Sequence, residues 1–426
     1  MRAHADEQVA VRPLFSDPAQ LAAWLAEHDL QIESARAKRE AALATSEQAG
    51  VLPNPQISAT VGGFVFGRTN PDVPRLGLNQ TTNISVGVSE LIELGKRGPR
   101  KHSASLRVDE AGELATAALG SRLGEAITIL GKLAYVTSRR AAMAANLESA
   151  RKQQALEQVR RDHADLSGAE YSRIELDTQQ LELQLGRADA DVATAIASCA
   201  ALMHAPCSTE GISEPASLDA GAPLPPQLPD TAPAIGAAIE ARATRLAAKL
   251  EVQALDSDAT LAEHRAIPDL TLGVGYTYDN LTVAGNQQQT GLVSLSFPLP
   301  VFDRGNHDAA ALRATARSQI ADDEASANVA HGEIEALRAQ RRTLEATVAT
   351  LETSAVPKSA QIVEQTRRAF DLGQAGLAEL LLAERAHREL LLELLDTRFD
   401  LFNVRAQLRQ ALGLDDQAAR AVRRPS

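Results

Sequence analysis

The sequence predicts a mainly α-helical fold with a small β part, built from one structural unit that occurs twice. The chain has 426 residues, of which 44% are hydrophobic but only 3% aromatic. An apolar content made mostly of Ala and Leu is typical of long helices and coiled coils. Four short runs alternate apolar with small polar residues, which is the pattern of strands. Segments in the two halves also match each other in the same order.

The duplication is supported by three pairs of segments at nearly one offset. NPQISATVGG (54–63) resembles IPDLTLGVGY (267–276), VSELIELGKRG (88–98) resembles LSFPLPVFDRG (295–305), and LSGAEYSRIEL (166–176) resembles LGQAGLAELLL (372–382). Such self-similarity indicates a repeated unit. We therefore predict an N-terminal extension (1–16), a first repeat (17–205), a proline-rich connector that cannot be regular helix (206–233), a second repeat (234–414) and a C-terminal tail (415–426).

Each repeat is expected to contain one β-hairpin, at about 57–91 and about 269–298. The strands are about ten residues long, which suits a tilted strand that crosses a bilayer. One face is apolar and the other carries small polar residues. Two soluble hairpins packed on helices would also alternate, but several aromatic residues fall in or next to the runs, as girdles do at membrane interfaces. These aromatic residues are Phe64, Phe66, Tyr276, Tyr278 and Phe297.

Each repeat then continues into a long antiparallel helical hairpin, at about 99–204 and about 306–412. Residues recur at alternating spacings of three and four in 334–355 and in 387–412. That spacing is typical of coiled-coil seams, although arginines occupy some of these positions. Pro357 is expected to kink or break the second arm because proline cannot donate a helical hydrogen bond.

Glycine and proline mark the joints where strands lead into the helical arms. Glycine lets the backbone turn sharply, and proline suits the first residue of a helix. The joint residues are Gly95, Gly98, Pro99 and Gly305. Four neighbouring cations suit contact with lipid phosphates or carboxylates, or else form a solvated face. They are Lys96, Arg97, Arg100 and Lys101.

Composition and motifs exclude several classes of function. A net charge of −12 with interspersed cations argues against nucleic-acid binding. No phosphate loop, nucleophile motif or metal-ligand spacing occurs, so we expect no enzyme activity, cofactor or metal site. Cys199 and Cys207 could form a disulfide in an oxidising compartment, but we favour two small buried thiols. No 18-residue apolar run is present, and the first residues lack the apolar core of a secretory signal.

The strands also set a minimum assembly. Four strands cannot close a barrel, and an open edge in lipid leaves backbone groups unpaired at a cost of several kcal/mol each. A barrel needs at least eight strands, so at least two copies of the chain must share it.

From about Asp17 to Leu414 the order of elements and the duplication resemble the TolC-type outer-membrane factors, the outer membrane efflux protein family. LPNPQIS followed by IELGKRG is most similar to the heavy-metal branch, the CzcC-like and CusC-like partners of resistance-nodulation-division pumps, whose joint often reads ELGGKR with one more glycine. The resemblance implies long helical hairpins that form an α-barrel and two transmembrane β-hairpins that give four strands to a trimeric β-barrel. The barrel would lie in the outer-membrane lipid of a Gram-negative bacterium, and the helical part in the periplasm.

The same resemblance implies an exit duct that exports heavy-metal cations together with a periplasmic adaptor protein and an inner-membrane pump. A multidrug or type I secretion duct would have the same architecture. A soluble coiled-coil scaffold would explain the arms but not the strands.

In the family, the hairpin tips carry a glycine followed six residues later by an acidic residue that lines the periplasmic aperture. Gly373 and Glu379 match this pattern, whereas the first half has Ser167 at the glycine position and Arg173 at the acidic one. We hypothesise that Arg173 and Glu379 pair between neighbouring hairpins and hold the aperture shut; two exposed charges without effect are the alternative. Further candidates are Asp165 and Asp371 at the aperture, and Gly168 and Gly376 with Ser167 and Gly373 for adaptor contact.

Overall fold

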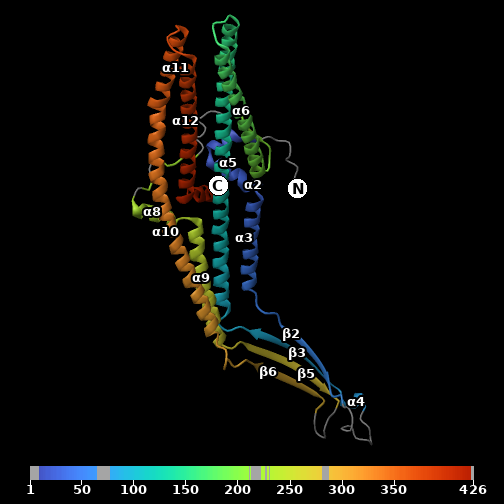
Figure 1. Ribbon diagram of the computed structural model, residues 1–426. Coiled ribbons are helices and arrows are strands. Elements are labelled where there is room, and N and C mark those ends of the chain that lie inside the picture. The colour runs from blue at the N-terminus through green and yellow to red at the C-terminus, as the bar shows by residue number, and fades with distance from the viewer. Residues whose placement is uncertain are drawn as a thin grey trace. The chain divides into compact units, whose positions relative to one another are not determined.

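A computed structural model describes residues 9–64, 77–210, 212, 222–225, 228–229, 231–280 and 287–423 (Figure 1). Contacts divide the chain into two compact units. Unit 1 contains Met1–Ala37, Gly112–Leu246 and Asp323–Ser426, and unit 2 contains Lys38–Ala111 and Ala247–Asp322. Each unit draws residues from both halves of the chain, so the units are not the two repeats.

Unit 2 carries the sheet, and the predicted small β part is confirmed. Its elements are the second part of α3 (Leu30–Ala49), β2 (Gln56–Gly62), α4 (Leu78–Thr81), β3 (Asn83–Ile92), the first part of α5 (Arg97–Asp162), most of α9 (Ala243–Glu263), a 3₁₀ turn (His264–Ala266), β5 (Leu270–Asp279), β6 (Gln289–Ser296) and the start of α10 (Asn306–Thr350). The strands are antiparallel in the order β2-β3-β5-β6 (Figure 1). The predicted hairpins are β2–β3 and β5–β6, and β3 pairs with β5 to join them.

The strand register confirms that the sheet has one apolar and one small polar face. Val88 lies opposite Ile57 and Val274, and Gly87 lies opposite Ser58 and Gly275. On the polar face the hydroxyl groups of Ser85 and Thr277 share a hydrogen bond of 2.9 Å.

In its described residues, unit 1 is helical except for one short strand pair. Its elements are β1 (Val9–Ala10), α1 (Val11–Ser16), α2 (Pro18–His28), the start of α3, most of α5, α6 (Gly168–Met203), β4 (Cys207–Ser208), α8 (Ala232–Glu240), the first residues of α9, most of α10, a π-helical turn (Leu351–Ala355), α11 (Val356–Asp371), α12 (Leu377–Ala411) and α13 (Leu414–Arg423). β1 pairs with β4 in parallel. Helices α5 and α6 form one hairpin, and α10 to α12 form the second.

The main core of unit 1 packs α1, α2, α5, α6 and α12 together. Phe402 on α12 is 1% exposed, and its ring lies where a Cβ on Gly131 of α5 would stand. Gly131 is therefore needed for the close approach of these two helices. Val11 and Phe15 belong to the same core, so part of the predicted N-terminal extension is packed against the helices.

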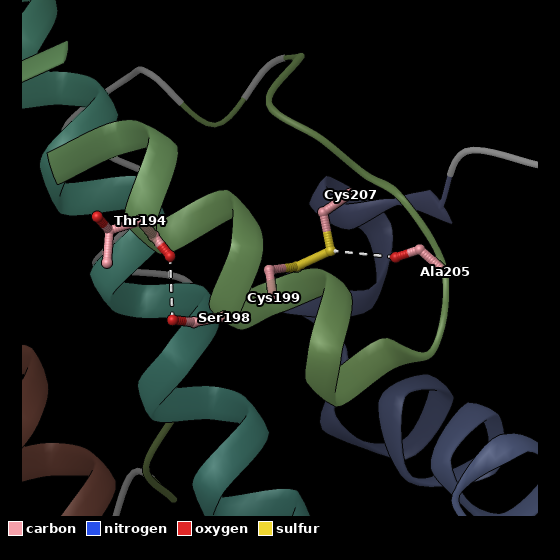
Figure 2. The surroundings of a disulfide bond; sticks show 5 residues. All are labelled: Thr194, Ser198, Cys199, Ala205 and Cys207. Carbon is pink, nitrogen blue, oxygen red and sulfur yellow. Dashed lines mark hydrogen bonds between the residues drawn. A yellow bond between two sulfur atoms is a disulfide. The ribbon is translucent and has the colours of Figure 1, made fainter. Parts of the chain in front are cut away.

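A disulfide joins Cys199 to Cys207, which corrects the expectation of two thiols (Figure 2). His204 ends α6 in a left-handed conformation with φ 53°, and this turn brings Cys207 back alongside α6. The bond therefore fixes β4, which pairs with the N-terminal strand β1.

Pro357 disturbs the second arm as predicted, although the arm does not break. The π-helical turn Leu351–Ala355 immediately precedes α11, in which Pro357 is the second residue. A π turn holds an extra residue, so the face of the helix that packs is shifted beyond it.

Two of the arginines at predicted seam positions have acidic partners on the facing helix, and the third has one on its own helix. Arg398 of α12 lies 2.5 Å from Glu352, and Arg405 lies 3.5 Å from Glu345. Arg341 also reaches Glu345 at 3.4 Å. Salt bridges therefore replace part of the apolar seam. Within the described residues, no helix contains a stretch long and apolar enough to span a membrane.

Candidate functional site

The first helical hairpin turns between α5 and α6 through a left-handed residue and a capped helix start. Ala164 has φ 63°, and the N–H of Asp165 donates to the carbonyl of Arg160 at 2.8 Å. The hydroxyl of Ser167 accepts from the N–H of Glu170 at 3.2 Å, and the Glu170 carboxylate accepts from the N–H of Ser167 at 3.1 Å. This capping box satisfies two backbone donors at the start of α6.

The second hairpin turns between α11 and α12 in a similar way but without a side-chain cap. Gly373 has φ 69°, and the N–H of Gln374 donates to the carbonyl of Ala369 at 2.8 Å. Gly376 precedes α12 and has no side chain to accept from the helix start. Glycine therefore takes the left-handed position here, which Ala164 takes in the first tip.

The caps correct the alignment of the two tips by three residues. Ser167 and Gly376 hold the same position before their helices, 209 residues apart, rather than the 206 inferred from the sequence. The third residue of the following helix is Glu170 in the first tip and Glu379 in the second. Both tips thus carry a glutamate there, and Arg173 lies one turn further along α6.

The same correction applies to the acidic aperture candidates. Asp371 is the last residue of α11, and its counterpart at the end of α5 is Asp162, not Asp165. Asp165 and Gly168 are exposed in the first tip. Asp162 forms an ion pair with the adjacent Arg161 at 2.9 Å.

The charges of the first tip act mainly on one another. Hydrogen bonds from Ser167, first from its hydroxyl and then from its backbone, lower the pKa of Glu170, and the charge of Arg173 adds to this effect. Arg173 and Glu379 are both exposed, and no ion pair joins them to each other in the described part of this chain.

The two tips share a small apolar cluster. Its buried members are Leu166, Ile174, Phe370, Leu377 and Leu380. The guanidinium of Arg160 lies 4.8 Å from the ring centre of Phe370, and that of Arg161 lies 4.3 Å from the ring centre of Tyr171. These contacts connect the end of α5 to both tips.

An ion pair that sequence reasoning did not select joins the two hairpins close to the tips. Arg388 of α12 lies 3.0 Å from both carboxylate oxygens of Asp177 on α6. Their side chains are only 15% and 23% exposed. The charge pattern could not reveal this pair, because the two residues are 211 positions apart. The residue before Arg388, His387, lies with its Nδ1 2.7 Å from the hydroxyl of Ser359.

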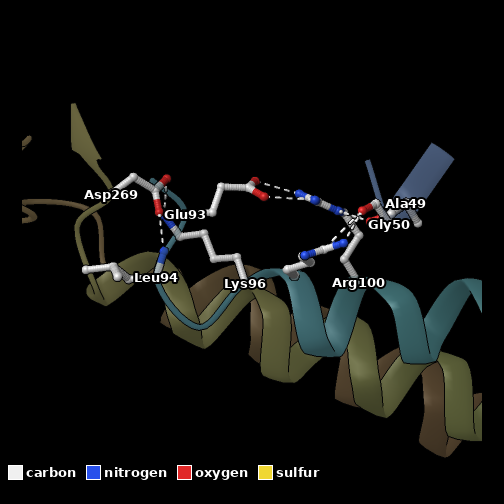
Figure 3. Close-up of polar contacts among 8 residues, drawn as sticks. Ala49, Gly50, Glu93, Leu94, Lys96, Arg100 and Asp269 are labelled. Carbon is white, nitrogen blue, oxygen red and sulfur yellow. Dashed lines mark hydrogen bonds and ion pairs between the residues drawn. The ribbon is translucent and has the colours of Figure 1, made fainter. Parts of the chain in front are cut away.

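Three of the four joint cations in unit 2 contact partners in the chain (Figure 3). Arg100 forms two hydrogen bonds with Glu93, at 2.6 and 2.8 Å, and a third with the carbonyl of Ala49. Lys96 pairs with Asp269 at 2.7 Å, and Arg97 donates to the carbonyl of Gly50. These cations bind the end of α3 and the start of β5, whereas Lys101 is exposed.

The joint glycines differ in what they do. Gly95 and Gly305 have φ 76° and 75°, so both turn in the left-handed region that favours glycine. Gly98 lies inside α5, which begins at Arg97, and a Cβ there would meet no atom within 4 Å. Pro99 is consequently the third residue of the helix rather than the first.

The apolar face of the sheet is exposed, and most of the predicted aromatic residues surround it. Phe64, Tyr276 and Phe297 are 48–49% exposed. Tyr276 and Tyr278 point to the apolar face opposite Val86 and Ile84. Phe297 directly follows β6 at the other end of the sheet. Phe66 lies outside the described residues.

A carboxylic acid pair joins α5 and α9 in unit 2. Glu110 shares a hydrogen bond with Glu251, and burial together with this contact raises the pKa of Glu110 to about 7. No group of three His, Cys, Asp or Glu residues able to hold a metal ion occurs in the described part of the chain.

Comparisons with known proteins agree with this architecture. Residues 234–414 match the family model described as outer membrane efflux protein. The outer-membrane channel OprN is 17% identical, with a TM-score of 0.76 over 96% of this chain and 93% of that chain. This chain has the fold of an outer-membrane channel.

Two further solved channels show the same fold. VceC from Vibrio cholerae is 17% identical, with a TM-score of 0.72 over 93% of this chain and 96% of that one. CusC, whose structures are described as showing folding and transmembrane channel formation, is 14% identical, with a TM-score of 0.75 over 95% and 92%. Among curated proteins, no match is found.

Proposed function

We propose that this chain is the outer-membrane exit duct of a tripartite resistance-nodulation-division efflux system in a Gram-negative bacterium, working as a homotrimer. The family match over 234–414 and the fold shared with solved outer-membrane channels support this proposal. We also propose that the whole chain, and not only residues 234–414, belongs to the outer membrane efflux protein family.

The observation that carries the proposal is the sheet of unit 2. Its apolar side chains are exposed, for example Ile57 at 79% and Val293 at 74%, whereas a sheet in water would cover such a face. β2 and β6 are its outermost strands, and each has one edge without a partner strand in the described residues. Lipid against the apolar face and a neighbouring copy at each edge would satisfy both features.

The helical part suits a periplasmic tunnel whose tips meet an adaptor protein. Tight turns before α6 and α12, the first capped by Ser167, present both tips as defined surfaces, and Glu170 and Glu379 give each one an acidic residue. In a ring of copies these carboxylates, with Asp162 and Asp371, would narrow and charge the aperture. Glu379 is the third residue of α12, whereas Arg173 is the sixth residue of α6. The proposed lock therefore requires contact between residues at different heights on the two tips.

The disulfide supports a location outside the cytoplasm. Bonds such as Cys199–Cys207 persist in oxidising compartments, which include the bacterial periplasm. The cargo we propose is a heavy-metal cation, on the strength of the IELGKRG joint and the acidic tips. Transport requires passage rather than tight binding.

Native mass spectrometry of detergent-extracted protein, expressed with a secretion signal, tests the assembly. We expect a trimer that depends on detergent and that forms ion-conducting pores in planar bilayers. A monomer or dimer that stays in solution without detergent would refute the duct and leave a coiled-coil scaffold.

The cargo is tested separately in a host that lacks its own outer-membrane duct but retains the adaptor and the pump. We expect the chain to restore growth in zinc, copper or cobalt salts. Restored resistance to organic drugs alone would assign a multidrug duct, and restored protein secretion alone would assign a type I secretion duct.

A further inference from the structure

The loop between β6 and α10, residues 297–305, is ordered by its own polar contacts. The N–H of Val301 donates to the carbonyl of Leu299 at 2.8 Å, and Arg304 Nε donates to the carbonyl of Pro300. Asp303 accepts from the N–H of Gly305 at 2.8 Å. The buried Gly305 then anchors the loop against Ala262. The loop therefore has a defined conformation before it meets any partner.

Its apolar side chains nevertheless point outward. Leu299 is 72% exposed, Val301 is 62% exposed and Phe302 is fully exposed. Exposing three large apolar side chains together to water is unfavourable for a loop that has no partner. This cluster is the mark of a surface that another molecule covers.

A cavity of about 750 Å³ lies at the other joint of the same unit. It is lined by residues from α3, α5, α9 and the segment that precedes β2, among them Ala42, Gln48, Val51, Leu52, Pro53 and Ala104. Two ion pairs close its polar side. One is the Glu93–Arg100 pair described above, and the other joins Arg107 to Asp258 at 2.7 Å. Because these charges already have partners, the open part of the cavity suits an apolar group.

Strand order brings the loop and the cavity together across two copies of the chain. β6 runs toward its helical joint and β2 runs away from its own, so β6 of one copy can pair with β2 of the next in antiparallel fashion. The loop follows the last residue of β6, and the lining segment precedes the first residue of β2.

The register within the sheet places the contact more closely. One row of paired residues runs from Gln56 through Ser89 and Gly273 to Ser294. If the row continues into the next copy, Ser294 pairs with Gln56 of that copy. Because the strands are antiparallel, Leu299, five residues after Ser294, then lies beside Val51, five residues before Gln56. Phe302 then lies beside Gln48. The tilt of barrel strands slides this register along the edge, and the lining residues extend six positions either way, from Ala42 to Asn54.

We propose that Phe302, with Leu299 and Val301, docks into the joint cavity of a neighbouring copy of this chain. The contact rests on the proposed shared barrel but goes beyond it. It would fix the rotational position of each sheet against the next at the level where the strands meet the helices, because the two faces of the strands exclude a slip by one residue but not a slip by two.

Engineered disulfides test the docking directly. Phe302→Cys is combined, in separate variants, with a cysteine at Gln48, Val51, Leu52 or Asn54. Within one copy the two edges are three strand spacings apart, about 14 Å, which is too far for a disulfide. Bonds between copies should therefore appear as covalently linked dimers and trimers on oxidation, while Cys199 and Cys207 remain paired with each other.

A control set separates this inference from the proposed function. Leu295→Cys is combined with a cysteine at Ile57, Ala59 or Val61, all on the apolar face of the two edge strands. Bonds in the control set without any in the Phe302 set would overturn the docking and leave the shared barrel in place. If neither set forms bonds, both proposals are wrong.

Lipid could cover Phe302 instead of a neighbouring copy, and tryptophan fluorescence distinguishes these two environments. In a Trp24→Phe background, which removes the single native tryptophan, Phe302→Trp should resist quenching by brominated lipids. Strong quenching would place the side chain in lipid and refute the docking. Phe302→Asp should also lower the subunit association constant on the order of tenfold or more, whereas Phe64→Asp, at the other end of the sheet, should lower it less.

Discussion

Substituting two of the three joint glycines, Gly305 and Gly98, should change the free energy of unfolding differently. Gly305 has φ 75°, and a Cβ there would stand 1.9 Å from the carbonyl oxygen of Ala262. An alanine in the left-handed region costs about 1–2 kcal/mol, and displacing a packed backbone costs about 1–3 kcal/mol more. Gly305→Ala should therefore lower the free energy of unfolding by about 2–5 kcal/mol.

Gly98→Ala is the matched control, because this residue lies in α5 with open space around it. Alanine reduces the freedom of the unfolded chain, so this variant should be neutral or more stable by up to about 1 kcal/mol. Urea unfolding in detergent, followed by the helical circular dichroism signal, measures both variants. If Gly305→Ala lies within about 0.5 kcal/mol of the parent, or if the two variants shift stability in the same direction, the assignment of the joint is wrong.

Three further predictions concern the tips, the disulfide and the carboxyl pair. Arg388→Ala leaves Asp177 half-buried without its partner, so amide exchange at the tips should speed up, whereas Arg385→Ala on the surface should change little. Cys199→Ser should lower stability by about 2–3 kcal/mol and abolish the effect of reductant on the melting temperature; an unchanged reductant effect would contradict the bond. Because the pKa of Glu110 is raised to about 7, its contribution to stability is full below its ordinary value of 4.5 and is lost as pH rises through 7. Melting temperatures of Glu110→Gln should depend less on pH across this window, and equal slopes would refute the shift.

The sheet could be predicted from the sequence because alternation reports the two faces of a strand directly. The second hairpin was expected to begin at about residue 269, and β5 spans Leu270–Asp279. The apolar and polar faces also match, since a period of two is independent of the rest of the fold. Pro357 likewise predicted the place at which the second arm is disturbed, because its missing N–H acts locally.

The tips and the cysteines could not be predicted in the same detail. Matching letters aligned Ser167 with Gly373, but the backbone makes Ser167 a helix cap and Ala164 the left-handed residue. A tip is defined by hydrogen bonds that several residue types can make, so its alignment by residue identity fails. The disulfide depends on the left-handed turn at His204. Non-glycine residues rarely adopt this conformation, so it could not be predicted from the sequence.

The π-helical turn changes which side of the second arm faces its neighbours, and α5 in the first arm has no such turn. α5 runs through 66 residues as one helix, whereas the extra residue in Leu351–Ala355 rotates all of α11 relative to α10. Deleting one residue from that turn would restore regular winding and rotate α11 by about 100°. Ser359 would then leave His387, and Phe370 would leave Arg160. The side of α11 that faces its neighbours is thus set some twenty residues before the tip, by the length of the chain rather than by the chemistry of any residue at the tip.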